Sequence, residues 1–292
     1  MSKRLSKQST SSSVKFRRMK VTSRKGGPLL WIDFTDKRTV FSDDSGTLAD
    51  ADDTIQVALN KAHDARFGKA GNNALGSSIK QVTSSKRPQF KAGGQNGHSY
   101  ALFSAAALQT LVATAVIGNV DTNLLSASRL SGQDTTIFYV ARSTSATPGQ
   151  RAVIDLGTSD GGGGSDPIIV GTQSNHDYRV FIGDQSDKSG TVILDSGAQA
   201  TTNVEIWTVK LAGNGASYYY RNGNTSDGTT SGASKDHNYL FNTNDPGTFV
   251  QIGGAAAGKW NGSIYEVLIF IQALPDKEIK EIERQLKQKY NL

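Results

Sequence analysis

The sequence predicts an all-β fold: a two-sheet antiparallel jelly-roll sandwich with a short C-terminal helix and an extended N-terminal arm. Short stretches of β-branched and aromatic residues recur between Gly- and Asn-rich turns, at intervals of roughly ten to fifteen residues. Only the last segment has helical periodicity. The 292 residues include 31 glycines and only 20% charged residues, which favours turns over long helices. Many short strands without intervening helices indicate a sandwich rather than a parallel α/β sheet.

Strand-forming stretches follow one another along most of the chain. The first is residues 29–34, whereas residues 60–99 are polar and are expected to form long loops. Residues 101–120 carry no charge, but polar residues interrupt them, so buried strands are expected there rather than a membrane span. The Asn222-Gly223 pair fits a tight hairpin turn that needs positive φ. Further strands are expected at residues 135–142, 152–156, 168–170, 178–182, 192–194, 204–211, 217–221, 249–252 and 263–271.

The C-terminal segment is the one convincing helix. Pro275 and Asp276 suit its first turn, where a missing donor is tolerated and a carboxylate is favourable. Glu281 and Glu283 are expected to be solvated charges on its exposed side. Its apolar residues follow at spacings of three and four and should share one buried face: Ile279, Ile282, Leu286 and Tyr290.

The N-terminal 27 residues form a separate, basic arm. They contain nine basic residues and no acidic one, so the remaining chain carries −3 of the total net charge of +6. A uniformly basic nucleic-acid-binding domain is therefore not expected. The arm is expected to anchor the protein to an acidic surface of a larger assembly, with nucleic acid as a less favoured partner. The anchoring candidates are Lys15, Phe16, Arg17, Arg18, Lys20, Arg24 and Lys25.

Two other interpretations of the arm remain open. It could be a solvated tail that aids solubility, or a mitochondrial transit peptide, which shares its Arg- and Ser-rich composition. No apolar stretch of the length of a secretory signal follows its positive start. The absence of cysteine excludes disulfides and thiol catalysis but says nothing about compartment.

The C-terminal motifs resemble the concanavalin A-like lectin/glucanase superfamily, and most closely its laminin-G-like jelly rolls, common in phage structural and bacterial surface proteins. The most specific part runs from the G-S-I-Y-E-V strand at residues 262–267 through Leu274-Pro275-Asp276 to the final K-Y-N-L. Residues 30–33, 136–142 and 217–223 resemble the opening strand, the central strand and a hairpin of that fold. The resemblance implies a jelly-roll domain at residues 28–292 after an arm at residues 1–27. It leaves function open, because the superfamily includes carbohydrate binders, glycosidases, adhesion modules and virion components.

Catalytic and metal motifs are weak. Glycosidases need carboxylates grouped around one bond, but Glu205 and Glu266 each stand alone in their strands, so no catalytic residue is assigned and no enzyme is expected. The four histidines are isolated, and the glycine run at 161–164 lacks the Lys-Ser/Thr of a phosphate loop. No cofactor is expected. A structural calcium ion stays open in loops that hold Asp43, Asp44, Asp50, Asp52, Asp53 and the acids at 184–187, without an assigned ligand.

Sugar binding would need an aromatic platform beside amide groups. The candidates are Tyr219, Asn222 and Trp260, chosen from the tyrosines at 218–220 and their neighbours. The alternative is that alternate tyrosines fill the sandwich core and Trp260 covers a sheet end.

These observations lead to two expectations. The first is a non-enzymatic phage virion structural protein, such as a capsid decoration, knob or tail-fibre component, anchored through the basic arm and displaying a lectin-like jelly roll. Its partners would be other virion proteins and further copies of itself, and its location the virion. The alternative is a carbohydrate-binding adhesion module that recognises a host or environmental glycan, for example on a bacterial cell surface. Neither expectation includes a membrane span.

Overall fold

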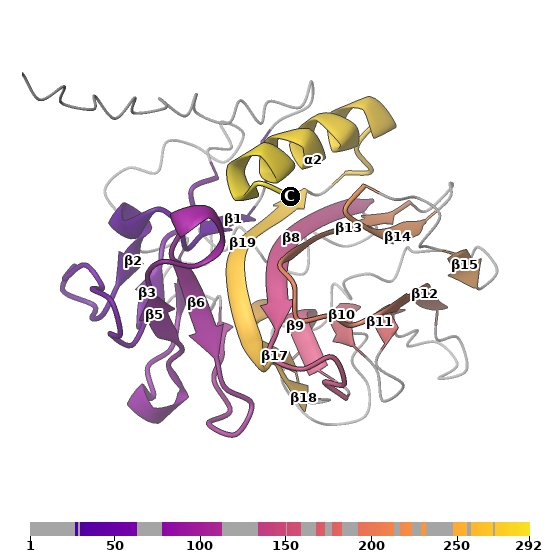
Figure 1. Cartoon of the computed structure of the whole chain (residues 1–292). Coiled ribbons are helices and arrows are strands. Elements are labelled where there is room, and N and C mark those ends of the chain that lie inside the picture. Colours follow the sequence, from indigo (N-terminus) through magenta and orange to yellow (C-terminus); the bar gives the residue numbers. More distant parts are fainter. Residues whose placement is uncertain are drawn as a thin grey trace, which may run out of the picture.

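The computed structural model places two β-sheets face to face, with the C-terminal α-helix on the outer side of one of them (Figure 1). It describes residues 27–28, 30–62, 78–112, 134–149, 151–158, 168–172, 177–182, 192–212, 217–223, 229–231, 248–255, 258–270 and 272–292. The predicted all-β sandwich with a C-terminal helix is confirmed. The arm, the glycine run at 161–164, the acids at 184–187, and His63, His176 and His237 lie outside the described residues, as do the anchoring candidates Lys15, Phe16, Arg17, Arg18, Lys20, Arg24 and Lys25.

The first sheet has seven strands, and we call it the helix-covered sheet. Its order is β14 (Tyr218–Arg221), β13 (Glu205–Leu211), β8 (Thr135–Ser143), β19 (Gly262–Phe270), β6 (Tyr100–Phe103) and β5 (Gln89–Lys91). A further strand, β1 (Leu30–Asp33), pairs with the second half of β19, antiparallel and beyond the pairing with β6.

The second sheet has twelve strands, and we call it the opposite sheet. Its main path is β15 (Thr229–Ser231), β12 (Val192–Gln199), β11 (Asp177–Ile182), β10 (Ile168–Thr172), β9 (Arg151–Thr158), β16 (Thr248–Ile252), β7 (Leu111–Val112), β4 (Ile79–Lys80), β3 (Val57–Ala58) and β2 (Val40–Phe41). The short pair β17 (Gly254–Ala255) and β18 (Gly258–Lys259) joins it beside β9. Short 3-10 turns lie at Lys37–Thr39 (η1), Ser84–Lys86 (η4) and Gln95–Gly97 (η5).

The central strands of the helix-covered sheet are buried on both faces. Along β8, Ile137 and Tyr139 join the core between the sheets, whereas Phe138 and Val140 pack on the helix side. All nine residues of β19 are buried. The sequences of these strands are therefore nearly continuous apolar runs and do not simply alternate between apolar and polar residues.

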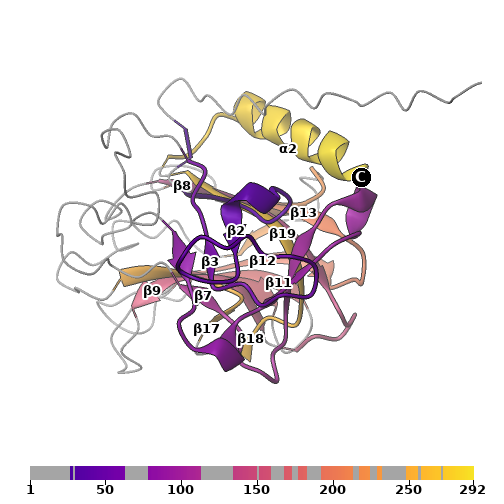
Figure 2. The same cartoon turned by 90° about the vertical axis from the view of Figure 1, so that its left-hand side faces the viewer.

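The helix α2 (Asp276–Tyr290) lies across the outer face of this sheet, as Figures 1 and 2 show from two directions. The predicted face is confirmed, because Ile279, Ile282, Leu286 and Tyr290 are all buried against that sheet. Asn291 ends the helix with φ +56°, a left-handed cap, and its N–H donates to the Lys287 carbonyl.

One helical prediction is wrong. Glu281 is solvated, but Glu283 is only 4% exposed, and its Oε1 accepts a hydrogen bond from Thr208 Oγ1 at 2.5 Å. The spacing of apolar residues along a helix predicts only which apolar side chains are buried. A polar residue beside that face can also be buried when the sheet supplies a hydrogen-bond donor, as Thr208 does here.

Two loop predictions also need correction. The segment 60–99 contains the short strands β4 and β5 where long irregular loops were expected. Asn222 and Gly223 do have positive φ, at +51° and +74°. However, β14 before them and β15 after them belong to different sheets, so the turn begins a connection between the two sheets rather than a hairpin.

Within residues 101–112 the expected buried strands occur as β6 and β7, and no helix in the described part is long and apolar enough to span a membrane.

Candidate functional site

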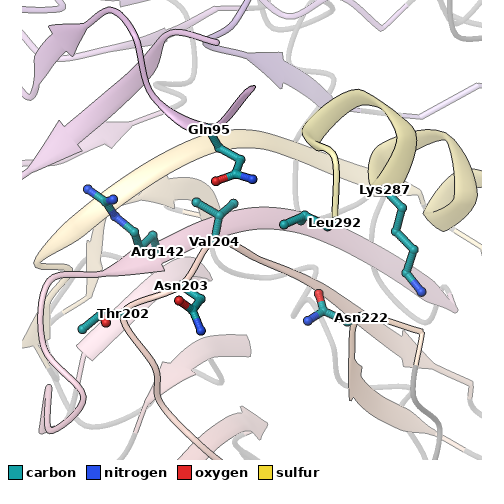
Figure 3. Close-up of a pocket in the computed structure, with 8 residues that line it drawn as sticks. All are labelled: Gln95, Arg142, Thr202, Asn203, Val204, Asn222, Lys287 and Leu292. Atoms are coloured by element: carbon teal, nitrogen blue, oxygen red, sulfur yellow. The ribbon is translucent and has the colours of Figure 1, made fainter. Parts of the chain in front are cut away.

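A hollow of about 510 Å³ opens on the helix side of the sandwich, beside the C-terminal end of α2. It is formed by side chains from five separate parts of the chain, shown in Figure 3. The lining residues are Gln95, Arg142, Thr202, Asn203, Val204, Asn222, Lys287 and Leu292. They comprise three amides, one hydroxyl, two cationic groups and two apolar side chains.

Two of the amides are held by the backbone around them. Asn222 Oδ1 accepts a hydrogen bond from the Ile206 N–H at 2.9 Å, and the Asn222 N–H donates to the Ile206 carbonyl at 2.7 Å. Gln95 Nε2 donates to the Tyr290 carbonyl at 2.9 Å, and its backbone N–H donates to Tyr265 Oη at 3.2 Å. Among the described residues, the other end of each amide has no hydrogen-bond partner: the Asn222 NH₂ group is left as a donor and Gln95 Oε1 as an acceptor.

The loop that precedes β13 carries the next two lining residues. Thr201 Oγ1 donates to Glu205 Oε1 at 2.9 Å and accepts a hydrogen bond from the Asn203 N–H at 3.1 Å. This turn presents Thr202 and Asn203 at the surface, where both are exposed.

At the other side of the hollow, the helix end is tied to η5. Gln95, Asn96 and His98 all contact carbonyl oxygens of the last helical turn, with His98 Nε2 3.0 Å from the Lys289 carbonyl. These contacts satisfy carbonyl groups that a helix end leaves unpaired. Leu292 follows directly after this helix end, and its N–H donates to the Lys287 carbonyl at 3.0 Å.

The charge of the lining is positive. Arg142 and Lys287 are the ionisable side chains among the eight, and none of these eight described residues has an acidic side chain. The side chains of these eight residues therefore offer hydrogen bonds and positive charge but no carboxyl, imidazole or thiol group. It suits binding better than acid–base chemistry.

The structure places the predicted sugar-binding residues differently. Tyr219 and Trp260 are 1% and 0% exposed, so the predicted aromatic platform is wrong: both rings fill the core. Tyr219 Oη lies 2.6 Å from Tyr139 Oη inside the sandwich. Asn222 alone of the three lines the hollow, and its role in sugar binding stays a prediction.

Sequence reasoning missed Gln95, Arg142, Thr202, Asn203 and Lys287. They are isolated polar residues in segments far apart along the chain, and none belongs to a motif. The clearest signal in the sequence was Asn222 itself, through the turn that it forms with Gly223.

A second polar cluster, which we call the ionic lock, joins β1, β19 and α2. Asp33 and Glu266 lie directly opposite each other on β1 and β19, and the Lys289 ammonium bridges them at 3.1 and 2.7 Å. Glu266 also accepts hydrogen bonds from Trp31 Nε1 at 2.7 Å and Tyr290 Oη at 2.8 Å. Each carboxylate is therefore neutralised and saturated with hydrogen bonds, as buried charges require.

The electrostatics of the lock follow from its burial. Burial raises the pKa of Glu266, which is 0% exposed, and Lys289 opposes that rise. Burial alone would raise the pKa of Asp33, but Lys289, Lys61 and their hydrogen bonds hold that pKa below its usual value. Burial disfavours the charged Lys289, yet Glu266 and Asp33 together keep its pKa above the usual value.

Two more buried carboxyl groups lie elsewhere in the sandwich. Burial raises the pKa of Glu205, against hydrogen bonds from Thr201 and Arg221. Asp155 is 8% exposed, and burial raises its pKa to about 7 although Lys259 acts in the other direction. Neither lines the hollow.

No group of three or more metal-ligating side chains occurs in the ranges that the structure describes. Asp43 Oδ1 accepts backbone N–H groups of Ser45 and Thr47, both at 2.9 Å, and Asp52 pairs with Lys91. These predicted calcium candidates thus have protein partners. The calcium ion stays a prediction.

Comparisons with known proteins give fold relatives only. No family model and no curated protein sequence matches the chain. A solved structure of Trypanosoma rangeli sialidase with 2,3-difluoro-KDN matches at 13% identity and a TM-score of 0.47, covering 92% of this chain and 33% of that one. The CBM40 module of Ruminococcus gnavus IT-sialidase, bound to α2,3-sialyllactose, matches at 15% identity and a TM-score of 0.42, with coverages of 54% and 86%.

Leech intramolecular trans-sialidase matches at 18% identity and a TM-score of 0.40, covering 52% of this chain and 23% of that one. The chain thus spans 23% of the leech enzyme's length and 33% of the Trypanosoma rangeli enzyme's length. These folds are compatible with the predicted concanavalin A-like sandwich, but no family is established and no link to phage proteins.

The prediction that this protein is not an enzyme is wrong as an exclusion, because sialidases, which are enzymes, are among the matched structures. That prediction relied on the lack of a carboxylate motif along one strand. Asp33 and Glu266 show why this reasoning fails: the fold brings two acids from distant segments directly opposite each other.

Proposed function

We propose that this protein is a carbohydrate-binding module and that the hollow beside the end of α2 holds the saccharide. The observation that carries the proposal is the lining itself: amide groups fixed by the backbone, each with a donor or acceptor that no described residue occupies, lie beside the apolar side chains Val204 and Leu292. A saccharide presents the same mixture of hydroxyl groups and apolar C–H faces. The volume of about 510 Å³ falls within the range of about 300–1,000 Å³ that is typical of small-molecule sites.

The test is a glycan screen with the full chain, followed by a variant that fills the hollow. Asn203→Trp places a large ring in it from an exposed position, and we expect at least a tenfold loss of affinity, about 1.4 kcal/mol. Ser85→Trp adds the same ring at an exposed position of η4, outside the lining, and should leave binding unchanged.

Thermal unfolding of both variants separates loss of the site from loss of the fold. Binding that survives Asn203→Trp would move the site elsewhere. A screen without any bound glycan would contradict the function itself.

A second candidate function rests on a different observation, the acid-free basic arm. We propose that residues 1–27 attach the protein to the negatively charged surface of a larger particle, as expected of a virion component. Nine basic residues without an acid provide long-range attraction to such a surface, and the attraction should weaken with salt. Attachment through the arm is compatible with saccharide binding by the body.

Co-sedimentation with particles of the virus that carries the protein tests this candidate. The full chain should sediment with them at low salt, and a full-length variant with Lys15, Arg17, Arg18 and Lys20 all changed to Gln should stay in the supernatant. The body is unchanged in this variant, so its unfolding temperature serves as the control. Equal sedimentation of both forms would show that the arm is no anchor.

A further inference from the structure

Charge distinguishes the hollow from the rest of the body. Residues 28–292 carry a net charge of −3, yet the described residues that line the hollow include Arg142 and Lys287 and no acidic side chain. In Figure 3, Arg142 lies at one end of the lining and Lys287 at the other, with Val204 and Leu292 between them. A locally positive hollow on a mildly acidic surface favours a negatively charged occupant.

Arg142 has no partner for its charge within the described part of the chain. It is half-buried on β8, and no hydrogen bond or ion pair to its guanidinium occurs there. Two other partly buried cations do have counter-charges: Lys61 lies 2.8 Å from Asp33, and Arg221 lies 3.0 Å from Glu205. A half-buried cation without a counter-charge loses part of its hydration without compensation, and a bound anion would supply that compensation.

Lys287 is compensated in part. A methyl group at Gly223 would lie 3.0 Å from Lys287 Nζ and 3.1 Å from Glu283 Oε2, so the two charges face the same turn. The attraction of Lys287 also lowers the pKa of Glu283, against the larger effect of burial. Arg142, which has no counter-charge among the described residues, is therefore the side chain that a bound anion would stabilise more.

We propose that the hollow selects saccharides that carry an acidic group, a carboxylate or a sulfate ester, and that Arg142 binds this group directly. The inference rests on the proposed carbohydrate binding and names its ligand class. A guanidinium group presents parallel N–H donors that match two oxygens of a carboxylate or sulfate. The amides of Gln95, Asn203 and Asn222 remain for the hydroxyl groups, and Lys287 adds long-range attraction from the far end.

The probes are two matched sets of monosaccharides: glucose, glucuronic acid and glucose 6-sulfate, and the corresponding galactose series. Within a set only the group at C6 changes, so a difference in affinity reports the charge. For the unmodified chain, ligand-observed NMR and calorimetry should give at least tenfold tighter binding of an acidic sugar than of its neutral partner. Raising the salt concentration should reduce the difference.

The variants assign the contact. Arg142→Gln should bring the acidic and neutral sugars of a set to equal affinity, and Arg142→Lys should keep part of the difference. Lys287→Gln should reduce it less than Arg142→Gln. Lys277→Gln removes the same charge from an exposed position of α2 outside the lining and should change nothing. Thermal unfolding checks that each variant folds.

The outcomes separate the two proposals. Equal affinity of the unmodified chain for acidic and neutral sugars, or no binding of any acidic probe, would overturn the acidic-group inference. Carbohydrate binding would still stand if the glycan screen found a ligand that Asn203→Trp removes. Preference for the acidic sugar that survives Arg142→Gln would overturn the role of Arg142. Inorganic sulfate that binds as tightly as the sulfated sugar would show a simple anion site, and the inference would fail.

Discussion

Replacing Lys289 with Met is expected to lower the free energy of unfolding by about 3–5 kcal/mol, the range for removing one partner of a buried ion pair. The ammonium group lies 2.7 Å from Glu266 Oε2 and 3.1 Å from Asp33 Oδ1, and its side chain is 16% exposed. Without it, Glu266 would keep a buried negative charge beside a second carboxylate. Urea unfolding followed by circular dichroism measures the loss.

Two further variants show whether the loss comes from the unpaired charge. Lys277→Met removes an exposed lysine from the first turn of α2, where no ion pair to a described residue exists, and should change stability by no more than about 0.5 kcal/mol. Adding Glu266→Gln to Lys289→Met should recover part of the stability, because Asp33 retains Lys61 at 2.8 Å. A loss below about 1 kcal/mol for Lys289→Met would mean that water reaches the lock and screens it.

The regular elements of this fold could be predicted because their signals are local. The apolar face of α2 is complete within fifteen residues, and its four apolar side chains are all buried as expected. The strand at residues 135–142 is confirmed as β8, because β-branched and aromatic residues mark it without reference to any other segment.

The tyrosines at 218–220 show where local signals end. Alternation along a strand predicts that neighbouring rings point to opposite faces, so one face of β14 should offer exposed rings. Both faces of this sheet are covered, however: Tyr219 lies in the core between the sheets, and Tyr220 packs on the helix side at 6% exposed. Which face of β14 is solvated depends on where α2 packs, and the tertiary structure decides this rather than the sequence of the strand.

The candidate site could not be predicted for the same reason. Arg142 and Lys287 line the same hollow only because α2 folds back over the sheet that contains β8. Nothing in the sequence around either residue indicates this. The lock is a similar case. The final Lys289-Tyr290 pair is part of the C-terminal motif, but its chemistry depends on Asp33 and Glu266, which the pairing of β1 with β19 places opposite each other.

Replacing Trp207 with Ala is expected to destabilise the fold by about 3–5 kcal/mol, the range for removing a large buried aromatic side chain. Trp207 is 0% exposed on β13, and its ring centroid lies 3.9 Å from that of Tyr178 and 5.0 Å from that of Tyr219. Tyr178 belongs to the opposite sheet and Tyr219 to the helix-covered sheet, so the indole fills the space between the two layers.

Trp207→Phe keeps part of the ring contact and should lose less stability than Trp207→Ala. Tyr218→Ala removes a half-buried ring from β14 on the helix side of the same sheet, and this comparison variant should also lose less stability. Chemical unfolding with binding of a hydrophobic dye separates two mechanisms. A cavity in an intact sandwich lowers stability without dye binding, whereas separated sheets bind the dye before global unfolding. We expect the cavity, because the core between the sheets also includes the buried aliphatic side chains of Ile137, Val209 and Val267. A loss below about 1.5 kcal/mol for Trp207→Ala would show that the neighbouring tyrosines close the space, and that the contact between the layers rests on those aliphatic side chains instead.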